Sequence, residues 1–271
     1  FFPSSFVIND KKWELEKDGE LTLSQSVVSA SEVKFSQGNQ QIIISTEPSE
    51  ISNSHDVVIN LKEVNLNDFV PFVLKTQRLE GQMTGSIRIL DPFGKPNIET
   101  DARINEFRLD GDSIGIVNAS GTYSVASGIA QFKVDAENIK NRFKIDGSIN
   151  TKDSTENQVD VSLVSETLNL NILNNYLGSI FSDIRGVANT SDLKVKGNSK
   201  HLSLTGTANI TEGSLVVNYT QCKYKFSNET IILNPDEIDF GSIVLKDTLN
   251  NTATLSGKMY HRFFQNISFD N

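Results

Sequence analysis

Apolar and polar residues alternate along most of this chain, and residues 202–226 show the pattern clearly. Alternation with a period of two sends one set of side chains to one face of a β-sheet. The apolar set of this stretch is therefore expected to share one face, and it comprises Leu202, Leu204, Ala208, Ile210, Leu215, Val217, Tyr219, Tyr224 and Phe226. Similar segments follow one another about ten residues apart, which is typical of an antiparallel meander.

Dipeptides that favour tight turns separate several of these segments. Asp-Gly at 18–19 and at 110–111 and Ser-Gly at 127–128 predict short hairpin connections. One segment breaks its own alternation, because Ile104 and Phe107 are three positions apart rather than two. We expect a local irregularity in the strand at that point.

Two segments depart from the period of two and predict short amphipathic helices. In residues 67–77, Phe69, Phe72 and Val73 recur at helical spacing, and Pro71 lies in the first turn, where its missing N–H costs nothing. In residues 171–181 the apolar face is predicted to consist of Leu173, Tyr176, Leu177, Ile180 and Phe181.

The two helical segments indicate an internal repeat. Residues 64–73 and 168–177 begin alike, and each helix is followed by a segment centred on a glycine, Gly81 in one case and Gly186 in the other. Similarity at a fixed offset is a signature of repeat architecture. We expect one continuous β-rich body over residues 1–271, with internal repeat units at approximately 64–167 and 168–271.

Glycine also recurs inside the predicted strands, at the centre of a five-residue motif that begins with an apolar residue and ends with an apolar or small one. The motif occurs at 79–83, 83–87, 145–149, 184–188, 204–208 and 255–259. Glycine weakens a strand interior, so its repeated placement there indicates relief of crowding on the inside of a curved sheet, or a bend. The fold class predicted is all-β, with a long, antiparallel, strongly curved sheet and two short helices.

Composition and charge narrow the classes of function. The 271 residues carry a formal net charge of −9, which argues against binding to nucleic acid phosphates. No apolar run reaches the roughly 18 residues that a membrane-spanning helix needs. The single cysteine, Cys222, excludes an internal disulfide and is expected to be a buried, inert thiol in a strand. Both ends of the sequence read as strand, which predicts a piece of a longer protein.

Motifs for catalysis, metals and cofactors are not found in the sequence. The histidines lack second ligands at metal spacing, and there is no phosphate-binding loop, dinucleotide fingerprint or nucleophile elbow. The acidic group Asp236, Glu237 and Asp239 is interpreted as a solvated turn rather than a calcium site or an acid/base pair. His261 is interpreted as a strand-end residue with a structural hydrogen bond. We expect a non-enzymatic protein without a cofactor.

The C-terminal region resembles the TamB family of the AsmA-like superfamily, in its Bacteroidetes-type form. The resemblance rests on residues 213–233 and 238–270, and within the latter on Asp247, Asn251, Ala253, Leu255, Gly257 and His261. The helix-plus-glycine segments at 64–89 and 168–195 are also similar to the family, so the resemblance covers about 64–271.

The resemblance implies a fold and a function. The fold is a β-taco, a long sheet folded into a U-shaped trough with an apolar lining and with short helices seated at or in it. The function is that of a periplasmic part of an inner-membrane-anchored bridge, whose anchor lies outside this sequence. Such a bridge holds phospholipid acyl chains for transport to the outer membrane, or assists outer-membrane protein assembly and secretion with a TamA-type β-barrel partner. Candidate groove residues are Ile104, Phe132, Val134, Phe143, Leu204, Val217, Tyr219 and Leu255.

Three other interpretations stay open at this point. Barrel assembly would use an open sheet edge that pairs with a nascent strand, rather than an apolar groove. A β-sandwich adhesin or carbohydrate-binding module would fit the strand pattern, although Trp13 is the single tryptophan beside 16 phenylalanines. An enzyme has the least support, since no constellation of reactive side chains is evident.

Overall fold

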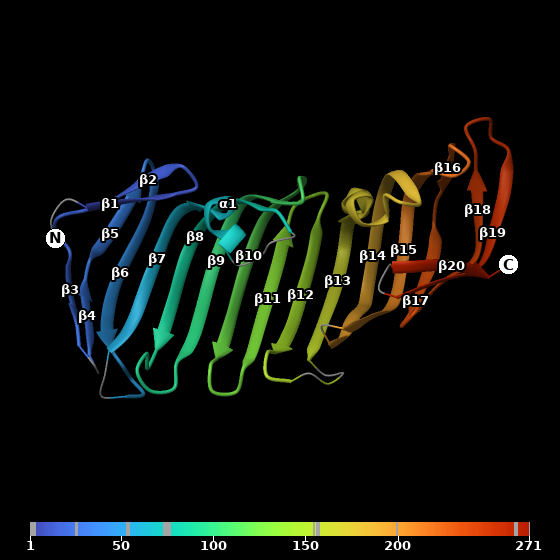
Figure 1. The fold of residues 1–271 in the computed structure, drawn as a ribbon. Coiled ribbons are helices and arrows are strands. Elements are labelled where there is room, and N and C mark those ends of the chain that lie inside the picture. The colour runs from blue at the N-terminus through green and yellow to red at the C-terminus, as the bar shows by residue number, and fades with distance from the viewer. Residues whose placement is uncertain are drawn as a thin grey trace. The chain divides into compact units, whose positions relative to one another are not determined.

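The chain folds almost entirely into antiparallel β-strands (Figure 1). This structure is a computed structural model that describes residues 4–24, 27–52, 55–72, 77–153, 155, 158–198, 200–262 and 265–270. Strands β3 and β4 form a small sheet, and the other described strands belong to one large sheet. The prediction of an all-β, antiparallel fold with two short helical segments is confirmed.

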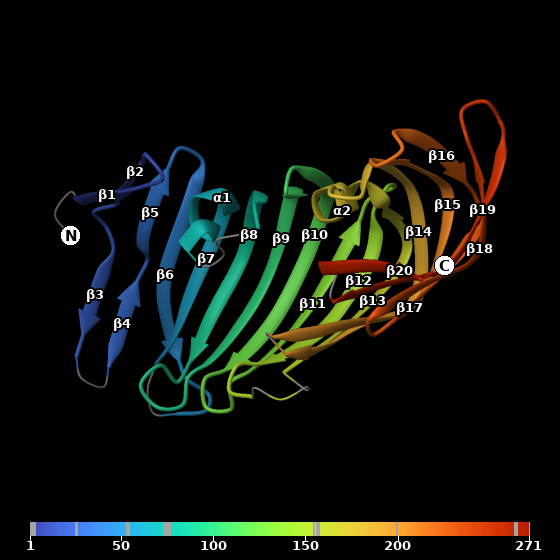
Figure 2. The same ribbon diagram turned by 45° about the vertical axis from the view of Figure 1, so that its right-hand side comes forward.

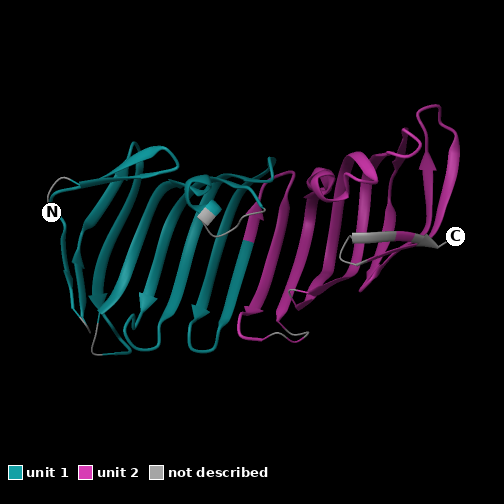
Figure 3. Ribbon diagram, in the orientation of Figure 1, with its two compact units in different colours: residues 1–134 teal, residues 135–271 magenta. Residues whose placement is uncertain are grey.

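Two compact units divide the chain, residues 1–134 and 135–271, and the division falls within β11 (Figure 3). The elements of unit 1 are β1 (Ser4–Ile8), β2 (Lys11–Leu15), β3 (Glu20–Leu23), β4 (Val28–Ser31), β5 (Val33–Gln37), β6 (Gln40–Pro48), β7 (His55–Asn65), α1 (Leu66–Phe69), η1 (Val70–Phe72), β8 (Leu79–Leu90), β9 (Asn97–Leu109), β10 (Asp112–Ser124) and the first part of β11 (Ile129–Glu137).

Unit 2, like unit 1, consists of antiparallel strands and one short helical segment. Its elements are the end of β11, β12 (Arg142–Asn150), β13 (Val159–Asn169), η2 (Leu170–Leu173), α2 (Asn174–Leu177), β14 (Phe181–Asn198), β15 (His201–Val217), β16 (Cys222–Phe226), β17 (Glu229–Asn234), β18 (Glu237–Lys246), β19 (Thr252–Arg262) and β20 (Gln265–Asp270). The long β15 pairs with two strands on one side. Its residues Gly213–Val217 pair with β16, and its residues Gly206–Ile210 pair with β17.

Both helical segments are shorter than the sequence predicts. In unit 1, α1 and η1 together cover Leu66–Phe72, and Val73 lies outside the described residues. In unit 2, the helical segment ends at Leu177, so Ile180 lies in a turn and Phe181 begins β14. Side-chain bonding explains the early end, because Asn174 accepts a hydrogen bond from the backbone N–H of Ile184 at 2.8 Å and thereby ties α2 to the next strand.

Each helical segment starts from a strand end that a buried amide side chain holds. In unit 1, the backbone N–H of Asn65 donates to Oε1 of Gln40 at 2.8 Å. In unit 2, the backbone N–H of Asn169 donates to Oδ1 of Asn141 at 3.0 Å. Gln40 and Asn141 are both buried, and both lie beside the turn of the preceding hairpin. This shared arrangement is a property of the structure that the sequence pattern did not suggest.

Glycine in the strand that follows each helix marks a break in strand register. Gly81 has a φ of 138° and Gly186 a φ of 132°, values that side chains with a β-carbon rarely adopt. The pairing of β8 with β9 shifts beside Gly81, and that of β14 with β15 shifts beside Gly186. The two segments are thus locally alike, whereas the unit boundary at residue 134 differs from the expected repeat boundaries, and the repeat stays a prediction.

The expected turns and irregularity are only partly found. Asp-Gly at 110–111 joins the paired strands β9 and β10, as expected. The irregularity near Ile104 is present, because Glu106 has a φ of 54°. The prediction of a hairpin at Asp18-Gly19 is wrong. This dipeptide connects β2 to β3, and β3 pairs with β4 rather than with β2.

Candidate functional site

One face of the unit 2 sheet is lined by apolar side chains in rows that run across neighbouring strands. Residues directly opposite each other in paired strands point to the same side of the sheet. Ile145 of β12 pairs with Leu163 of β13, which pairs with Leu193 of β14. A second row lies beside it and consists of Gly147, Val161, Val195 and Leu204. We call this surface the apolar face of unit 2.

The opposite face of the same strands is polar. Lys144, Ser162 and Lys194 alternate with the apolar set, and Ser162 pairs with Lys194. Lys196 and Asp160 form an ion pair of 2.9 Å across β14 and β13 on that side. Val164 is an exception, with 47% of its surface exposed. The strands are thus apolar on one face and charged on the other, as a sheet with a single solvated face requires.

The helical segment covers part of the apolar face of unit 2. Leu170 packs in one cluster with Ile184, Ala188 and Ile210, and further apolar side chains surround them. The Asn169 side chain accepts from the N–H of Asn171 and begins the segment. Both η2 and α2 contact β14, and Leu170 also packs against Ile210 of β15. The helical segment therefore covers the part of β14 and β15 that lies next to it.

The rest of the apolar face is only half-buried. Ile145, Leu163 and Leu193 keep part of their surface exposed, as do Val195 and Leu204. Strands β12 and β13 pair with their neighbours in the large sheet, to which all the described strands of unit 2 belong. The side chains of the two rows therefore keep part of their apolar surface in contact with solvent.

Unit 1 has an apolar face built in the same way. Val64 pairs with Met83, which pairs with Ile104, and Ile104 pairs with Val117. A second row runs through Ile44, Ile59 and Ile87, of which all three are half-buried.

An aromatic cover lies over part of the unit 1 face. The hairpin of β1 and β2 and the helix α1 lie on the same side of the sheet (Figures 1 and 2). Trp13 is completely buried against Leu61 and Val64. Its ring stacks on Phe6 with centroids 6.3 Å apart and meets Phe69 edge to face at 5.8 Å. This end of the face is closed by the chain itself.

A buried ion pair fixes this aromatic cover. The Asp68 side chain in α1 is fully buried, and Lys11 of the hairpin donates to its Oδ2 at 2.7 Å. Asn9 donates to Oδ1 of the same carboxylate at 3.0 Å. The hairpin and the helix are thereby joined by charge as well as by aromatic packing.

The structure distributes the eight candidate groove residues over both units. In unit 1, Ile104 is buried within the apolar rows, Phe132 lies beside Gly121 of β10, and Val134 is two positions further along β11. In unit 2, Phe143 pairs with Ser165 on the strand pair that carries the apolar rows, and Leu204 belongs to the second row.

The remaining candidates are Val217, Tyr219 and Leu255 of unit 2. Val217 is the last residue of β15 and pairs with Phe181, and Leu255 pairs with the buried Ile243. Tyr219 does not lie on a strand, because β15 ends at Val217, and Tyr219 is 97% exposed in the following turn. The expectation that it shares the face of Leu215 and Val217 is therefore wrong. The eight candidate residues are thus divided between the two units, and their role in a groove stays a prediction.

Sequence reasoning missed the buried polar residues and misplaced the thiol. Asp68, Gln40 and Asn141 are buried through contacts with distant segments, which alternation does not report. Cys222 is exposed at the start of β16, where a turn rather than a strand interior surrounds it, so the expected buried thiol is wrong.

Asp183 and His261 are among the titratable groups of unit 2 with shifted pKa values. Hydrogen bonds from Lys223 and, to a lesser extent, Arg185 lower the pKa of the Asp183 carboxyl below its ordinary value. Burial lowers the pKa of His261, and the charge of Asp236 opposes this in part.

No group of three or more potential metal ligands occurs within the described residues. None of the described helices has the length and apolar character to cross a membrane.

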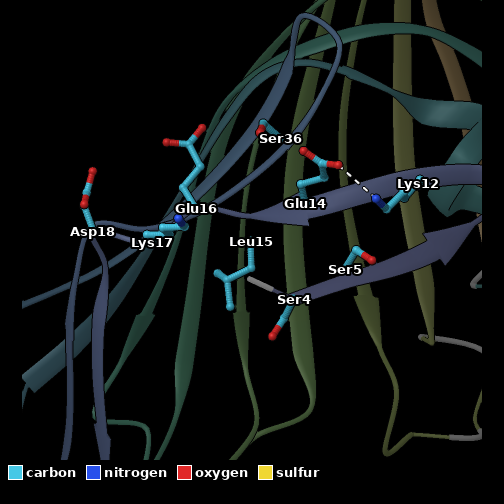
Figure 4. Close-up of a pocket in the computed structure, with 9 residues that line it drawn as sticks. All are labelled: Ser4, Ser5, Lys12, Glu14, Leu15, Glu16, Lys17, Asp18 and Ser36. Atoms are coloured by element: carbon cyan, nitrogen blue, oxygen red, sulfur yellow. Dashed lines mark hydrogen bonds and ion pairs between the residues drawn. The ribbon is translucent and has the colours of Figure 1, made fainter. Parts of the chain in front are cut away.

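A separate surface pocket lies at the N-terminal hairpin (Figure 4). Its lining is mostly polar and exposed, and it comprises Ser4, Ser5, Lys12, Glu14, Leu15, Glu16, Lys17, Asp18 and Ser36. Lys12 and Glu14 form an ion pair of 3.0 Å there. The lining contains three acidic residues (Glu14, Glu16 and Asp18) and two basic residues (Lys12 and Lys17).

Comparisons with known proteins do not assign this chain to a family. No family model, curated protein or solved structure matches it.

Proposed function

We propose that this chain is a non-enzymatic domain that binds lipid acyl chains on the apolar faces of its sheet. The observation that carries the proposal is the half-buried part of the unit 2 face, with Ile145, Leu163 and Leu193 in one row. Acyl chains require apolar area and no hydrogen-bond pattern, which is what such rows offer. Burial of apolar surface contributes roughly 25 cal/mol per Å².

The resemblance of the sequence to the TamB family supports a proposal for the cellular context of this binding. Within the proposal, the chain is a periplasmic part of an inner-membrane-anchored bridge, and phospholipid is its cargo. Outer-membrane protein assembly with a TamA-type barrel is a further role within the same proposal. The β-sandwich alternative receives less support, because a sandwich consists of two sheets, whereas the described strands other than β3 and β4 belong to one sheet.

Adjacent residues on opposite faces provide the test. Purified chain is examined by native mass spectrometry for co-purified lipid, and the Leu163→Asp and Val164→Asp variants are compared. Leu163 lies in the apolar row and Val164 on the polar face, so the first change is expected to abolish lipid binding and the second to preserve it. Circular dichroism checks that both variants remain folded.

Two results would contradict the proposal. One is the lack of any bound lipid on wild-type protein after mild extraction from cells. The other is equal lipid occupancy in the two folded variants, because binding would then not use the apolar row. If the Leu163→Asp variant unfolds, Leu204→Asn in the second row replaces it.

A further inference from the structure

Exposed apolar side chains gather on the turns at one edge of unit 2. Three turns and the helix α2 lie at this edge (Figures 1 and 2), and each of the four segments carries one large, exposed apolar or aromatic residue. The fraction is 87% for Ile139, 47% for Tyr176, 97% for Tyr219 and 80% for Leu249. We call these four residues and their segments the apolar-tipped rim.

Contacts between neighbouring segments support this edge. The hydroxyl of Thr167, at the end of β13, donates to the carbonyl of Ile139. Asn218, beside Tyr219, donates through its side chain to the carbonyl of Gly178, just after α2. Lys225 of β16 pairs with Lys246 of β18, which leads into the turn of Leu249.

The opposite edge of unit 2 differs. Its described turns, at 151–153, 198–201 and 234–237, hold mainly polar or charged residues such as Lys152, Asn198 and Asp236. Within the described residues, these turns carry no exposed large apolar side chain. Within the described part of unit 2, turns with exposed apolar residues therefore lie at one edge and not at the other.

Positive charge accompanies the apolar tips. In segments 137–142, 166–185, 215–225 and 246–251, basic residues outnumber acidic ones by six to four, although the whole chain carries −9. Lys225 and Lys246 lie directly opposite each other, an arrangement that repulsion disfavours unless an anion is near. Among the described residues, neither lysine makes an ion pair.

We propose that the apolar-tipped rim docks on a phospholipid bilayer surface. Tyrosine and apolar tips insert at the level of the headgroups, where amphipathic rings are favoured, and the lysines meet phosphate groups. Isolated tips on separate turns suit a deformable lipid surface, whereas a protein partner requires a contiguous, complementary area of about 1,000 Å². This goes beyond acyl-chain binding, and either property can exist without the other.

Vesicle flotation with the full chain tests the docking. Vesicles of phosphatidylcholine, with and without about 30% phosphatidylglycerol, are mixed with wild type and with the Tyr219→Ser/Leu249→Ser double variant. Wild type is expected to float with vesicles, and the double variant to bind roughly tenfold more weakly. A matched control, Val164→Ser/Ile232→Ser, removes two apolar residues that are 47% and 46% exposed on strands and should bind as wild type does.

Two further variants test the role of charge and the independence of docking from the apolar face of unit 2. Lys225→Gln/Lys246→Gln should reduce binding to the anionic vesicles and its dependence on salt. Leu163→Asp should leave flotation unchanged, which separates docking from acyl-chain binding. Docking is overturned if wild type does not float, or if the folded rim variant floats as well as the control variant. Loss of a dimer in the rim variant without any vesicle binding would assign the rim to a second copy instead.

Discussion

Asp68 is a fully buried carboxylate whose partners come from a distant part of the chain. Lys11 and Asn9 both bind it, and they belong to the N-terminal hairpin that closes one end of the unit 1 face. Sequence alternation predicts the strands on either side, but a charge in a short helix between strands looks like an ordinary surface residue. Only the tertiary contact with Lys11 gives Asp68 its role.

Breaking this ion pair is predicted to destabilise the protein. Lys11→Met leaves the Asp68 carboxylate buried without a counter-charge and is expected to lower the free energy of unfolding by about 2–3 kcal/mol, since Lys11 itself is partly exposed. Lys12→Met is the matched control, because the Lys12–Glu14 pair is exposed, and a change under about 0.5 kcal/mol is expected. Urea unfolding measures both, and equal losses would contradict this account.

Strand ends that lead into helices depend on two buried amides. Asn141 in unit 2 and Gln40 in unit 1 each accept from a backbone N–H that the sheet no longer pairs. The sequence predicts that a helix follows each strand, because periodicity changes there. It does not predict the amide, since the partner lies 28 residues away in one case and 25 in the other.

Removing the Asn141 amide is predicted to be costly. Asn141→Ala leaves the N–H of Asn169 buried without its acceptor, which should lower the free energy of unfolding by about 1–3 kcal/mol. Gln131→Ala removes an exposed amide on β11 and should change stability by less than about 0.5 kcal/mol. A loss in Asn141→Ala no larger than in the control, measured by urea unfolding, would show that water replaces the amide.

The end of β19 is predicted to make stability dependent on pH. Burial lowers the pKa of His261 in the folded state below its unfolded value of about 6.5, so the unfolded chain takes up the proton first. The stabilisation is complete above that pH and is lost as the pH falls through the folded pKa, by at most about 1.4 kcal/mol per unit.

Unfolding in urea at pH 7.5 and 5.5 checks the direction of this effect. The wild type should be less stable at the lower pH, and His261→Gln should show a smaller difference. The pKa values of the Asp183, Glu237 and Asp247 carboxyls are lowered, so these groups change their protonation below the pH range of the experiment. An unchanged pH dependence in the variant would remove His261 as the cause.

At the scale of the whole molecule, each unit presents one apolar and one polar sheet face. Period-two alternation suffices to predict this, and it correctly groups Leu204 with Ala208 and Ile210 on β15. It fails at Tyr219, where the strand stops and a turn takes over, because polar residues in strands and turns look alike in sequence. Alternation also does not predict which segments cover the apolar faces. Trp13 and Leu170 cover parts of them through contacts with residues that are distant in the sequence.

Site-specific crosslinking tests the central claim most directly. A benzophenone side chain replaces Val195, in the apolar row, or its neighbour Lys194, on the polar face, and each protein is illuminated with phospholipid vesicles. The account predicts a lipid adduct at position 195 and little or none at position 194. Equal labelling at both positions, or none at 195, would contradict binding of acyl chains on the apolar face.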